Sequence, residues 1–415
     1  MRPLNLPDQN LSEPDLSTLD LRDLDLFDLD LFTDGPPHEL FRRLRDEAPV
    51  CFLPEPNGPG FWAVTRYADV VAASRDAATF TSAPRVFIED PDEAVGDDHL
   101  LINIDPPRHT KLRKIVNRGF TPRQVAVLEP RIREIVVGLL DAAGSRGEFD
   151  LVGDVSVELP LQVIAELVGV PHEDRHRVFA LTEIMMSVGD PDLGHTVEDA
   201  RAAITEMFGY VDALAQERAA NPGDDLLSRI LAADVDGEAL TPIETDFFFM
   251  LLMNAGSETT RNLITGGMLA LFDHPEERAR LQSEAALLPT AIEEMLRWVT
   301  PVMHFRRTAA RDVELGGEQI RSGDKVVLWY TSANRDERAF PAAARFDVAR
   351  TPNEHVAFGA GGPHFCLGAS LARLEARVMF EELLTRMPTL EPGGPVRRLG
   401  SNFINGIKSL PVRTA

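Results

Sequence analysis

Apolar residues recur at helical spacing along most of the chain, and proline, glycine and aspartate separate the segments. Between residues 107 and 272 these segments follow one another and predict a succession of helices. The longest segment runs from Thr241 to Pro275, with proline near each end and none between. That pattern allows a helix of about 30 residues, roughly 45 Å long. A helix this long and apolar is expected to cross the middle of the protein.

Short runs of β-branched and aromatic residues interrupt the helical pattern. They predict strands at 50–52, 61–64, 304–308, 313–315 and 325–329. A further helix is predicted from Cys366 to about Arg386. Because helix dominates, we expect a mainly α protein with a small β-rich lobe and no doubly wound sheet.

The first 34 residues follow neither pattern. They are rich in Asp and Leu from Asp15 to Leu31, and the first 30 residues hold eight acids and two bases. Such a composition is typical of a solvated, weakly ordered segment. We therefore expect an acidic, flexible arm over residues 1–34.

The charge and the cysteine count narrow the classes of function. The 415 residues include 66 acids and 42 bases, for a net charge of -24, which disfavours nucleic acid and anionic membranes as partners. Two cysteines are too few for a zinc site of four thiolates or an iron–sulfur cluster. The longest apolar run, 247–253, is far shorter than the roughly 20 residues of a membrane span. Since the amino terminus runs into acids, the sequence predicts a cytoplasmic protein.

The stretch 358–368 is the most informative part of the chain. Three glycines and a proline precede Cys366, and a long predicted helix begins at that cysteine. Glycines let a backbone approach a flat group closely, and a helix start directs N–H groups at the sulfur. This environment favours a thiolate, which can be a nucleophile or a metal ligand. A lone cysteine is more often an inert buried residue, but the surrounding glycines weaken that interpretation.

This stretch resembles the haem-binding signature of the haem-thiolate monooxygenases, the cytochromes P-450, Phe-Gly-x-Gly-x-His-x-Cys-x-Gly. It departs from the signature once, because Phe358 lies eight residues before Cys366 and the usual spacing is seven. The extra residue is similar to that of bacterial members that hydroxylate steroid side chains and methyl-branched lipids. The resemblance implies that Cys366 is the axial thiolate ligand of the iron of haem b, with Phe358, Gly359 and Gly368 in the binding loop.

A polar turn interrupts the long central helix at residues 255–260. Thr can bond back to the carbonyl four residues earlier, and such a local defect makes room for a ligand beside the helix. Taken alone, the turn is more often a satisfied polar turn in a buried helix. The resemblance assigns Glu258 and Thr259 to proton delivery to iron-bound dioxygen.

Two further sets of residues match the family. Glu294 and Arg297, three apart on a predicted helix, would ordinarily be a surface pair. The resemblance implies that they are buried, are joined by Arg350 and serve the structure behind the haem. The haem propionates need cationic or hydrogen-bonding partners. The resemblance implies four such residues, His109, Arg113, Arg307 and His355, with His364 as a weaker candidate.

The resemblance spans roughly residues 36–410 and implies the triangular, mainly α cytochrome P-450 fold. It implies one catalytic domain over residues 35–415 and an oxidoreductase that uses dioxygen and two electrons. A haem sensor would not need the Glu258–Thr259 pair, and a cofactor-free cysteine nucleophile would not need Arg113 or Arg307. A peroxide-driven or coupling member would be expected to lack the acid–threonine pair.

The electrons are expected from outside the chain, because too few cysteines are present for a cluster. Residues 106–128 contain no acid but hold Arg108, Lys111, Arg113, Lys114, Arg118 and Arg123. We expect this segment to dock an acidic ferredoxin or flavodoxin that is served by an NAD(P)H reductase. The protein is expected to be a monomer.

The substrate is expected to be apolar. Candidate pocket residues come from apolar segments: Val86, Phe87, Leu101, Met185, Phe249, Met253, Ala255, Val302, Met303 and Ile404. Such positions are more often ordinary core. Together with the extra residue in the haem loop they favour a steroid, terpenoid or branched lipid, and a polyketide or aromatic natural product is the alternative.

Overall fold

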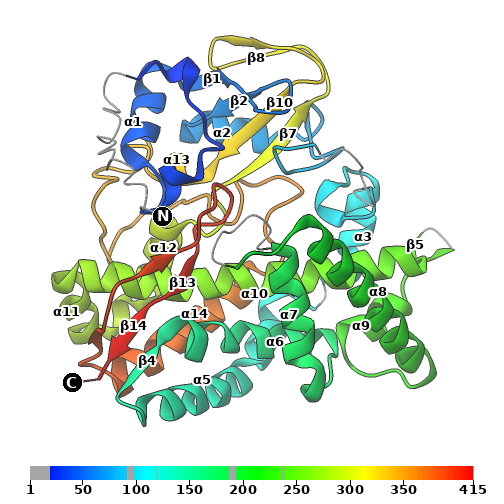
Figure 1. Ribbon diagram of the computed structural model, residues 1–415, viewed down its shortest axis with the longest axis vertical. Coiled ribbons are helices and arrows are strands. Elements are labelled where there is room, and N and C mark those ends of the chain that lie inside the picture. Colours follow the sequence, from blue (N-terminus) through cyan, green and yellow to red (C-terminus); the bar gives the residue numbers. More distant parts are fainter. Residues whose placement is uncertain (1–18, 91–97, 118, 187–192, 236–237, 415) are drawn as a thin grey trace, which may run out of the picture.

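The computed structural model describes residues 19–90, 98–117, 119–186, 193–235 and 238–414 (Figure 1). Its helices are α1 (His38–Glu47), α2 (Tyr67–Arg75), α3 (Arg108–Asn117), α4 (Pro122–Val127), α5 (Glu129–Gly144), α6 (Glu158–Val168), α7 (Arg175–Met186), α8 (Val197–Ala220), α9 (Leu226–Leu231), α10 (Pro242–Asp273), α11 (Pro275–Ser283), α12 (Leu288–Val299), α13 (Tyr330–Ala333) and α14 (Ala369–Arg386). None of the helices in these ranges is long and apolar enough to cross a membrane.

The strands are β1 (Val50–Leu53), β2 (Phe61–Val64), β3 (Phe80–Thr81), β4 (Glu148–Asp150), β5 (Asp234–Val235), β6 (Glu238–Ala239), β7 (His304–Ala309), β8 (Val313–Leu315), β9 (Glu318–Ile320), β10 (Lys325–Trp329), β11 (Glu391–Pro392), β12 (Arg397–Arg398), β13 (Ile407–Ser409) and β14 (Pro411–Arg413). Five of them form one sheet in the order β1-β2-β10-β7-β3, in which β10 is parallel to β2 and antiparallel to β7. The five strands predicted from the sequence correspond to β1, β2, β7, β8 and β10, so all five are present.

The helix α10 crosses the helical half of the molecule (Figure 1) and packs against α6, α8, α12 and α14. Its start is capped reciprocally, because the Thr241 hydroxyl accepts the Glu244 N–H while the Glu244 carboxylate accepts the Thr241 N–H. Proline follows at the first helical position and again two residues beyond Asp273. The predicted long central helix is confirmed.

The two faces of the five-stranded sheet meet different partners. Ala309, Val326 and Leu328 pack with residues of α2 and with Val356 of the loop before α14. Val327 and Trp329 point to the other face and pack with α1 and with residues of the amino-terminal segment. Alternate residues of β7 therefore look toward the loop that holds Cys366 or away from it.

The expected flexible arm is wrong for residues 19–34. Leu24, Leu26 and Phe32 are buried in the same cluster as Trp329. The acids between them cap the backbone, since Asp20 accepts the Arg22 N–H at 3.0 Å and Asp28 accepts the Asp30 N–H at 3.0 Å. The Asp-Leu alternation thus satisfies the backbone with its acids while its leucines cover the sheet. Residues 1–18 lie outside the described residues.

Candidate active site

Cys366 lies in a tight loop, three residues before α14 begins. The Cys366 N–H donates to the Phe358 carbonyl at 2.9 Å, which closes the loop. Gly362 has a φ of +80°, and a Cβ there would lie 2.3 Å from the Ser74 carbonyl oxygen at the end of α2. Only glycine meets both conditions, because the backbone is left-handed and a neighbouring backbone occupies the side-chain position.

The surroundings of the sulfur fit a thiolate ligand. Burial raises the pKa of the Cys366 thiol, while the N–H groups of Gly368 and Ala369 and the guanidinium groups of Arg113 and Arg373 act in the opposite direction. A metal ion at the sulfur would shift the balance to the thiolate. Cys366 has no disulfide partner and keeps accessible surface. Backbone N–H groups and guanidinium groups therefore surround the sulfur.

A short strip in the middle of α10 keeps accessible surface, although the residues around it are mostly buried. Ala255 is exposed and Thr259 half-buried, whereas Ser257 and Thr260 between and beside them are buried. The Thr259 hydroxyl donates to the Ala255 carbonyl at 3.0 Å, which is the expected back bond. The helix stays continuous through this turn. Ala255 and Thr259 are one turn apart, so their side chains share one accessible face of the helix.

Gly256 has a packing role that the sequence analysis did not foresee. A Cβ at this position would lie 2.7 Å from Cγ1 of Ile164, so α10 and α6 approach each other closely here. The glycine in the polar turn therefore serves helix packing on one side while Ala255 and Thr259 face the open side.

Glu258 is buried and paired with Arg261, with 2.5 Å between the carboxylate Oε2 and Nη2. Burial raises the pKa of Glu258; Arg261 lowers it, and Glu183 of α7 raises it further. This acid can therefore hold a proton at a pH where an exposed glutamate would have lost it. The sequence analysis missed Arg261, although its i,i+3 spacing to Glu258 was a usable signal.

Four predicted or weakly predicted residues form a cluster of donors. The rings of His109 and His364 lie 4.0 Å apart, and Nδ1 of His109 and Nε2 of His364 are buried without a hydrogen-bond partner. Burial lowers the pKa of His364 to about 2, with His109, Arg307 and Arg113 adding to the effect. Burial likewise lowers the pKa of His109 to about 4, helped by Arg113 and opposed by Asp105.

This cluster has an excess of donors over acceptors. Arg113 donates to the carbonyls of Pro363 and Phe365, and Arg307 to that of Arg306. Within the described ranges, neither arginine is paired with a carboxylate. Two cations and two neutral histidines with unpartnered nitrogens suit a ligand that carries carboxylates, as the haem propionates do. The residues present therefore fit haem.

The structure does not bring His355 into this cluster. Its Nε2 lies 3.0 Å from the Glu293 carboxylate, and its Nδ1 accepts the Ala357 N–H at 3.2 Å. Glu293 also binds Arg373, which stacks on the Phe358 ring at 4.5 Å. His355 thus supports the loop through Glu293, whereas His364, the weaker candidate, lies in the cluster with His109, Arg113 and Arg307. Both histidines precede Cys366 at short range, so the sequence alone does not distinguish them. The path of the loop places them in different surroundings.

Glu294, Arg297 and Arg350 lie together as a buried set. The side chains of Glu294 and Arg297 are 0% exposed and 2.7 Å apart, and Arg350 lies 3.0 Å from Glu294. Arg297 also donates to the carbonyls of Asn334 and Ala343 at 2.7 and 3.0 Å. Every charge in this set has an opposite charge or a hydrogen bond, so it ties α12 to the segment before the haem loop.

The candidate pocket residues divide into two groups. Phe87, Met185, Ala255 and Val302 keep accessible surface. Val86, Leu101, Phe249, Met253, Met303 and Ile404 are buried. Met303 packs with Phe32 and Trp329, so it belongs to the core under the amino-terminal segment.

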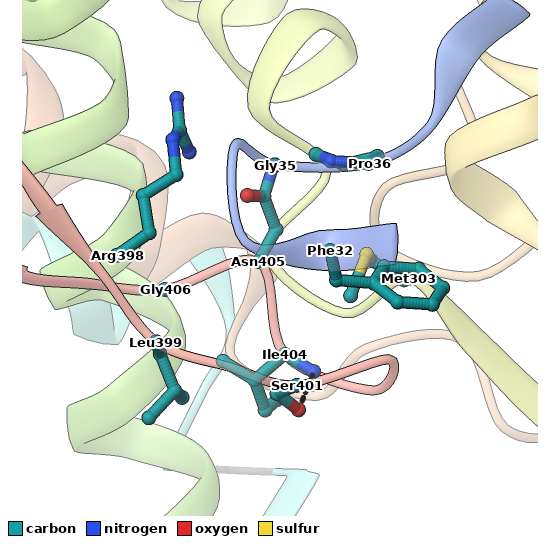
Figure 2. Close-up of a pocket in the computed structure, with 10 residues that line it drawn as sticks. All are labelled: Phe32, Gly35, Pro36, Met303, Arg398, Leu399, Ser401, Ile404, Asn405 and Gly406. Carbon is teal, nitrogen blue, oxygen red and sulfur yellow. Dashed lines mark hydrogen bonds between the residues drawn. The ribbon is translucent and has the colours of Figure 1, made fainter. Parts of the chain in front are cut away.

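A narrow cavity with no room for a water molecule lies beside Met303 and Ile404 (Figure 2). Its other walls come from residues 32–36 and from the turn between β12 and β13. None of its lining residues belongs to the Cys366 loop or to α10. This cavity is therefore not the cofactor site.

Comparison with known proteins gives one family. A family model described as Cytochrome P-450 matches residues 146–398. A methyl-branched lipid omega-hydroxylase from Mycobacterium tuberculosis is 45% identical over 383 residues, which are 90% of each chain. A steroid C26-monooxygenase from Rhodococcus jostii is 43% identical over 388 residues, 91% of this chain and 81% of that protein. The solved structure of a Mycobacterium marinum cytochrome P-450 with pseudoionone has a TM-score of 0.87 and 42% identity, covering 91% of this chain and 94% of its own.

The chain belongs to the cytochrome P-450 family. It has the mainly α fold of that family with its small β-rich lobe. It is a monooxygenase that binds haem b, uses dioxygen and receives electrons from an external redox partner. The predicted family, fold, enzyme class and cofactor are confirmed.

Proposed function

We propose that this enzyme hydroxylates the alkyl end of a methyl-branched lipid or of a steroid side chain. The support is the similarity over 90% of the chain to a methyl-branched lipid omega-hydroxylase, together with the similarity to a steroid C26-monooxygenase. Both names describe oxidation at a chain end. A cytochrome P-450 of bacillaene polyketide synthesis is similar in structure, but at 32% identity it gives weaker support for the alternative of a polyketide.

Cys366 would hold the haem iron, and the N–H groups of Gly368 and Ala369 would stabilise its negative charge. His109, His364 and Arg307 would donate to the propionates. Haem, when bound, supplies the chemistry that splits dioxygen and transfers one oxygen atom. Glu294, Arg297 and Arg350 would keep the loop in place without touching the cofactor.

Thr259 and Glu258 would manage the proton supply. The Thr259 hydroxyl now donates to Ala255, so it must turn away from that carbonyl to donate into the open space. The Glu258 carboxylate would carry the proton inward, and its pair with Arg261 would have to open for this. Burial, which raises the pKa of Glu258, favours the protonated form that such a relay requires.

We further propose that a ferredoxin or flavodoxin docks on the face around α3 and α4 of a monomeric protein. Lys111, Lys114 and Arg123 are exposed there. Arg108 is less suited than the sequence suggested, because it is paired with Glu244. Arg118 lies outside the described residues. A single catalytic domain would then begin at residue 19, and a cytoplasmic location remains a prediction from the sequence.

The test combines two spectra and one product analysis on the haem-loaded enzyme. The carbon monoxide adduct of the reduced protein is expected to show the red-shifted Soret band of thiolate-ligated haem, and Cys366→Ser is expected to lose it. A methyl-branched fatty acid and cholesterol are then tested for the low-to-high spin shift and for a terminal alcohol. A thiolate spectrum without oxidation of either lipid would contradict the substrate class and leave the monooxygenase assignment intact.

A further inference from the structure

Three phenylalanines from separate segments form a small aromatic wall. The Phe87 and Phe403 rings lie 5.2 Å apart and the Phe305 and Phe403 rings 5.6 Å apart. Each ring is only partly buried. Edge and tilted arrangements of this kind are favourable for aromatic rings, so the three side chains support one another.

The wall stands on the sheet face that looks toward the haem loop. Phe305 and Arg307 lie two apart on β7, so their side chains share a face. Arg307 acts on His364, two residues before Cys366. Phe305, and with it Phe403 and Phe87, therefore borders the space where substrate would meet the cofactor.

Two segments are hydrogen-bonded to β7 and its flank to form this wall. The Arg306 N–H donates to the Val86 carbonyl at 2.8 Å, and the Met303 N–H donates to the Phe403 carbonyl at 2.8 Å. Backbone bonds of this kind fix the register of a segment but leave room for it to tilt. The position of the Phe87 ring therefore depends on what holds the residues that follow it.

A buried ion network holds those residues from the opposite face of the sheet. Lys325 Nζ lies 2.7 Å from the Glu55 carboxylate and 2.8 Å from that of Asp90, and it donates to the Ile88 carbonyl at 2.9 Å. Arg306 lies 2.5 Å from Asp90 and donates to the Ile88 carbonyl at 3.1 Å. Two cations and two anions balance, and the backbone after Phe87 is bound by both cations.

The buried charges of this network would destabilise the folded protein if one of them lacked its partner. Arg306, Lys325 and Glu55 side chains are at most 4% exposed, and only Asp90, at 49%, reaches solvent. Burial would raise the pKa of Asp90, but Lys325 and Arg306 together hold it below its ordinary value. Buried charges need such exact pairing, and an apolar contact would dock the segment with less positional specificity. The four side chains thus define one position for residues 87–90.

We propose that Glu55, Asp90, Arg306 and Lys325 form a positioning network that fixes Phe87 against Phe403 and Phe305, and that this aromatic wall determines which carbon of an apolar chain is oxidised. The inference rests on the proposed hydroxylation of an alkyl chain end. The wall would exclude the penultimate carbons from the reacting position and leave room for the terminal methyl group.

The experiment compares product distributions from the haem-loaded enzyme with a methyl-branched fatty acid. Phe87→Ala and Phe403→Ala remove the wall itself. Asp90→Asn removes one charge of the network at its exposed corner, Asp90→Glu restores the charge, and Glu391→Gln removes an exposed carboxylate of the Arg413 pair as a matched control. The ratio of subterminal to terminal alcohol is expected to rise by about tenfold in the Phe variants and about threefold in Asp90→Asn. Asp90→Glu and Glu391→Gln should keep the wild-type ratio, and all variants the carbon monoxide spectrum.

Two outcomes would overturn the inference. An unchanged ratio in Asp90→Asn with a changed ratio in Phe87→Ala would show that the network only maintains the fold. An unchanged ratio in both would show that the wall does not touch substrate. If the wild-type enzyme does not oxidise the branched lipid, the proposed substrate fails, and the same ratio comparison is made with pseudoionone, so the two failures are told apart.

Discussion

The two clusters of charged and polar side chains near the haem loop are opposite in composition. In the first, Glu294 binds both Arg297 and Arg350, and the remaining arginine donors meet backbone carbonyls. In the second, which holds His109, His364, Arg113 and Arg307, neither arginine is paired with a carboxylate of the described residues. A cluster that satisfies itself has a structural role, whereas a cluster with surplus donors is prepared for a ligand.

Breaking the self-satisfied cluster should have the largest effect. Arg297→Leu leaves Arg350 as the remaining cation beside the buried Glu294 carboxylate, and three backbone carbonyls lose their Arg297 donor. We expect the free energy of unfolding to fall by about 3–5 kcal/mol, measured by urea titration of the apoprotein. An equal loss in Arg311→Leu, an exposed arginine of the sheet lobe, would show that the effect is not specific to the cluster.

Removing a cation from the cluster with surplus donors should weaken haem binding and leave the stability of the apoprotein unchanged. Arg307→Leu removes a buried cation that is paired with no carboxylate in the part of the chain that the structure describes. We expect haem to transfer to apomyoglobin about ten- to a hundredfold faster, since a hydrogen bond to a charged group contributes about 1.5–3 kcal/mol. A strong loss of apoprotein stability with unchanged haem transfer would contradict the comparison.

Acid should weaken the apoprotein through the same cluster. Burial lowers the pKa of His364 to about 2 and that of His109 to about 4, while the unfolded imidazoles titrate near 6.5. Below pH 6.5 the unfolded state binds protons that the folded state does not bind, so the free energy of unfolding falls as the pH drops. Above pH 6.5 the two histidines no longer lower it. Each histidine contributes at most about 1.4 kcal/mol per pH unit.

His364→Phe should remove one of these two contributions. Urea unfolding of the apoprotein at pH 7, 6 and 5 measures the slope, with His172→Phe as an exposed control. A slope that is identical in wild type and His364→Phe would show that acid acts elsewhere.

Exposed cations provide the smallest expected effect. Lys114 and Arg123 belong to neither cluster and would act only when an acidic donor approaches. The double variant Lys114→Glu and Arg123→Glu should slow reduction by a ferredoxin by about tenfold at low ionic strength, and salt should shrink the difference. Arg321→Glu, an exposed arginine directly after β9, is the matched control, and equal rates in all three proteins would contradict the docking face.

The sequence could predict the elements that depend on local pattern. The long helix α10 and the five strands follow from periodicity and from proline placement. The Cys366 loop follows from its glycines. The arm could not be predicted, because leucines 24 and 26 are buried by strands more than 300 residues away as well as by nearby ones. Composition describes solvation but not the partner that covers a segment.

The spacing of residues along the sequence predicted part of the site and left the rest undetermined. His355 and His364 both precede Cys366 at short range, and they lie in different surroundings because His355 is hydrogen-bonded to Glu293. Phe305 and Phe403 were parts of apolar segments without a distinguishing pattern. Their contact with Phe87 comes from tertiary hydrogen bonds to the β7 region, which no local signal reveals.

The close approach of Gly362 to Ser74 has a consequence for loop exchange. The loop passes so close to the end of α2 that a side chain at Gly362 would collide with the Ser74 carbonyl oxygen. The Ser74 hydroxyl also donates to the Gly361 carbonyl at 3.3 Å. The loop and the end of α2 therefore form one packing unit. A transplant of the loop into a shorter-looped relative would require the last turn of α2 as well.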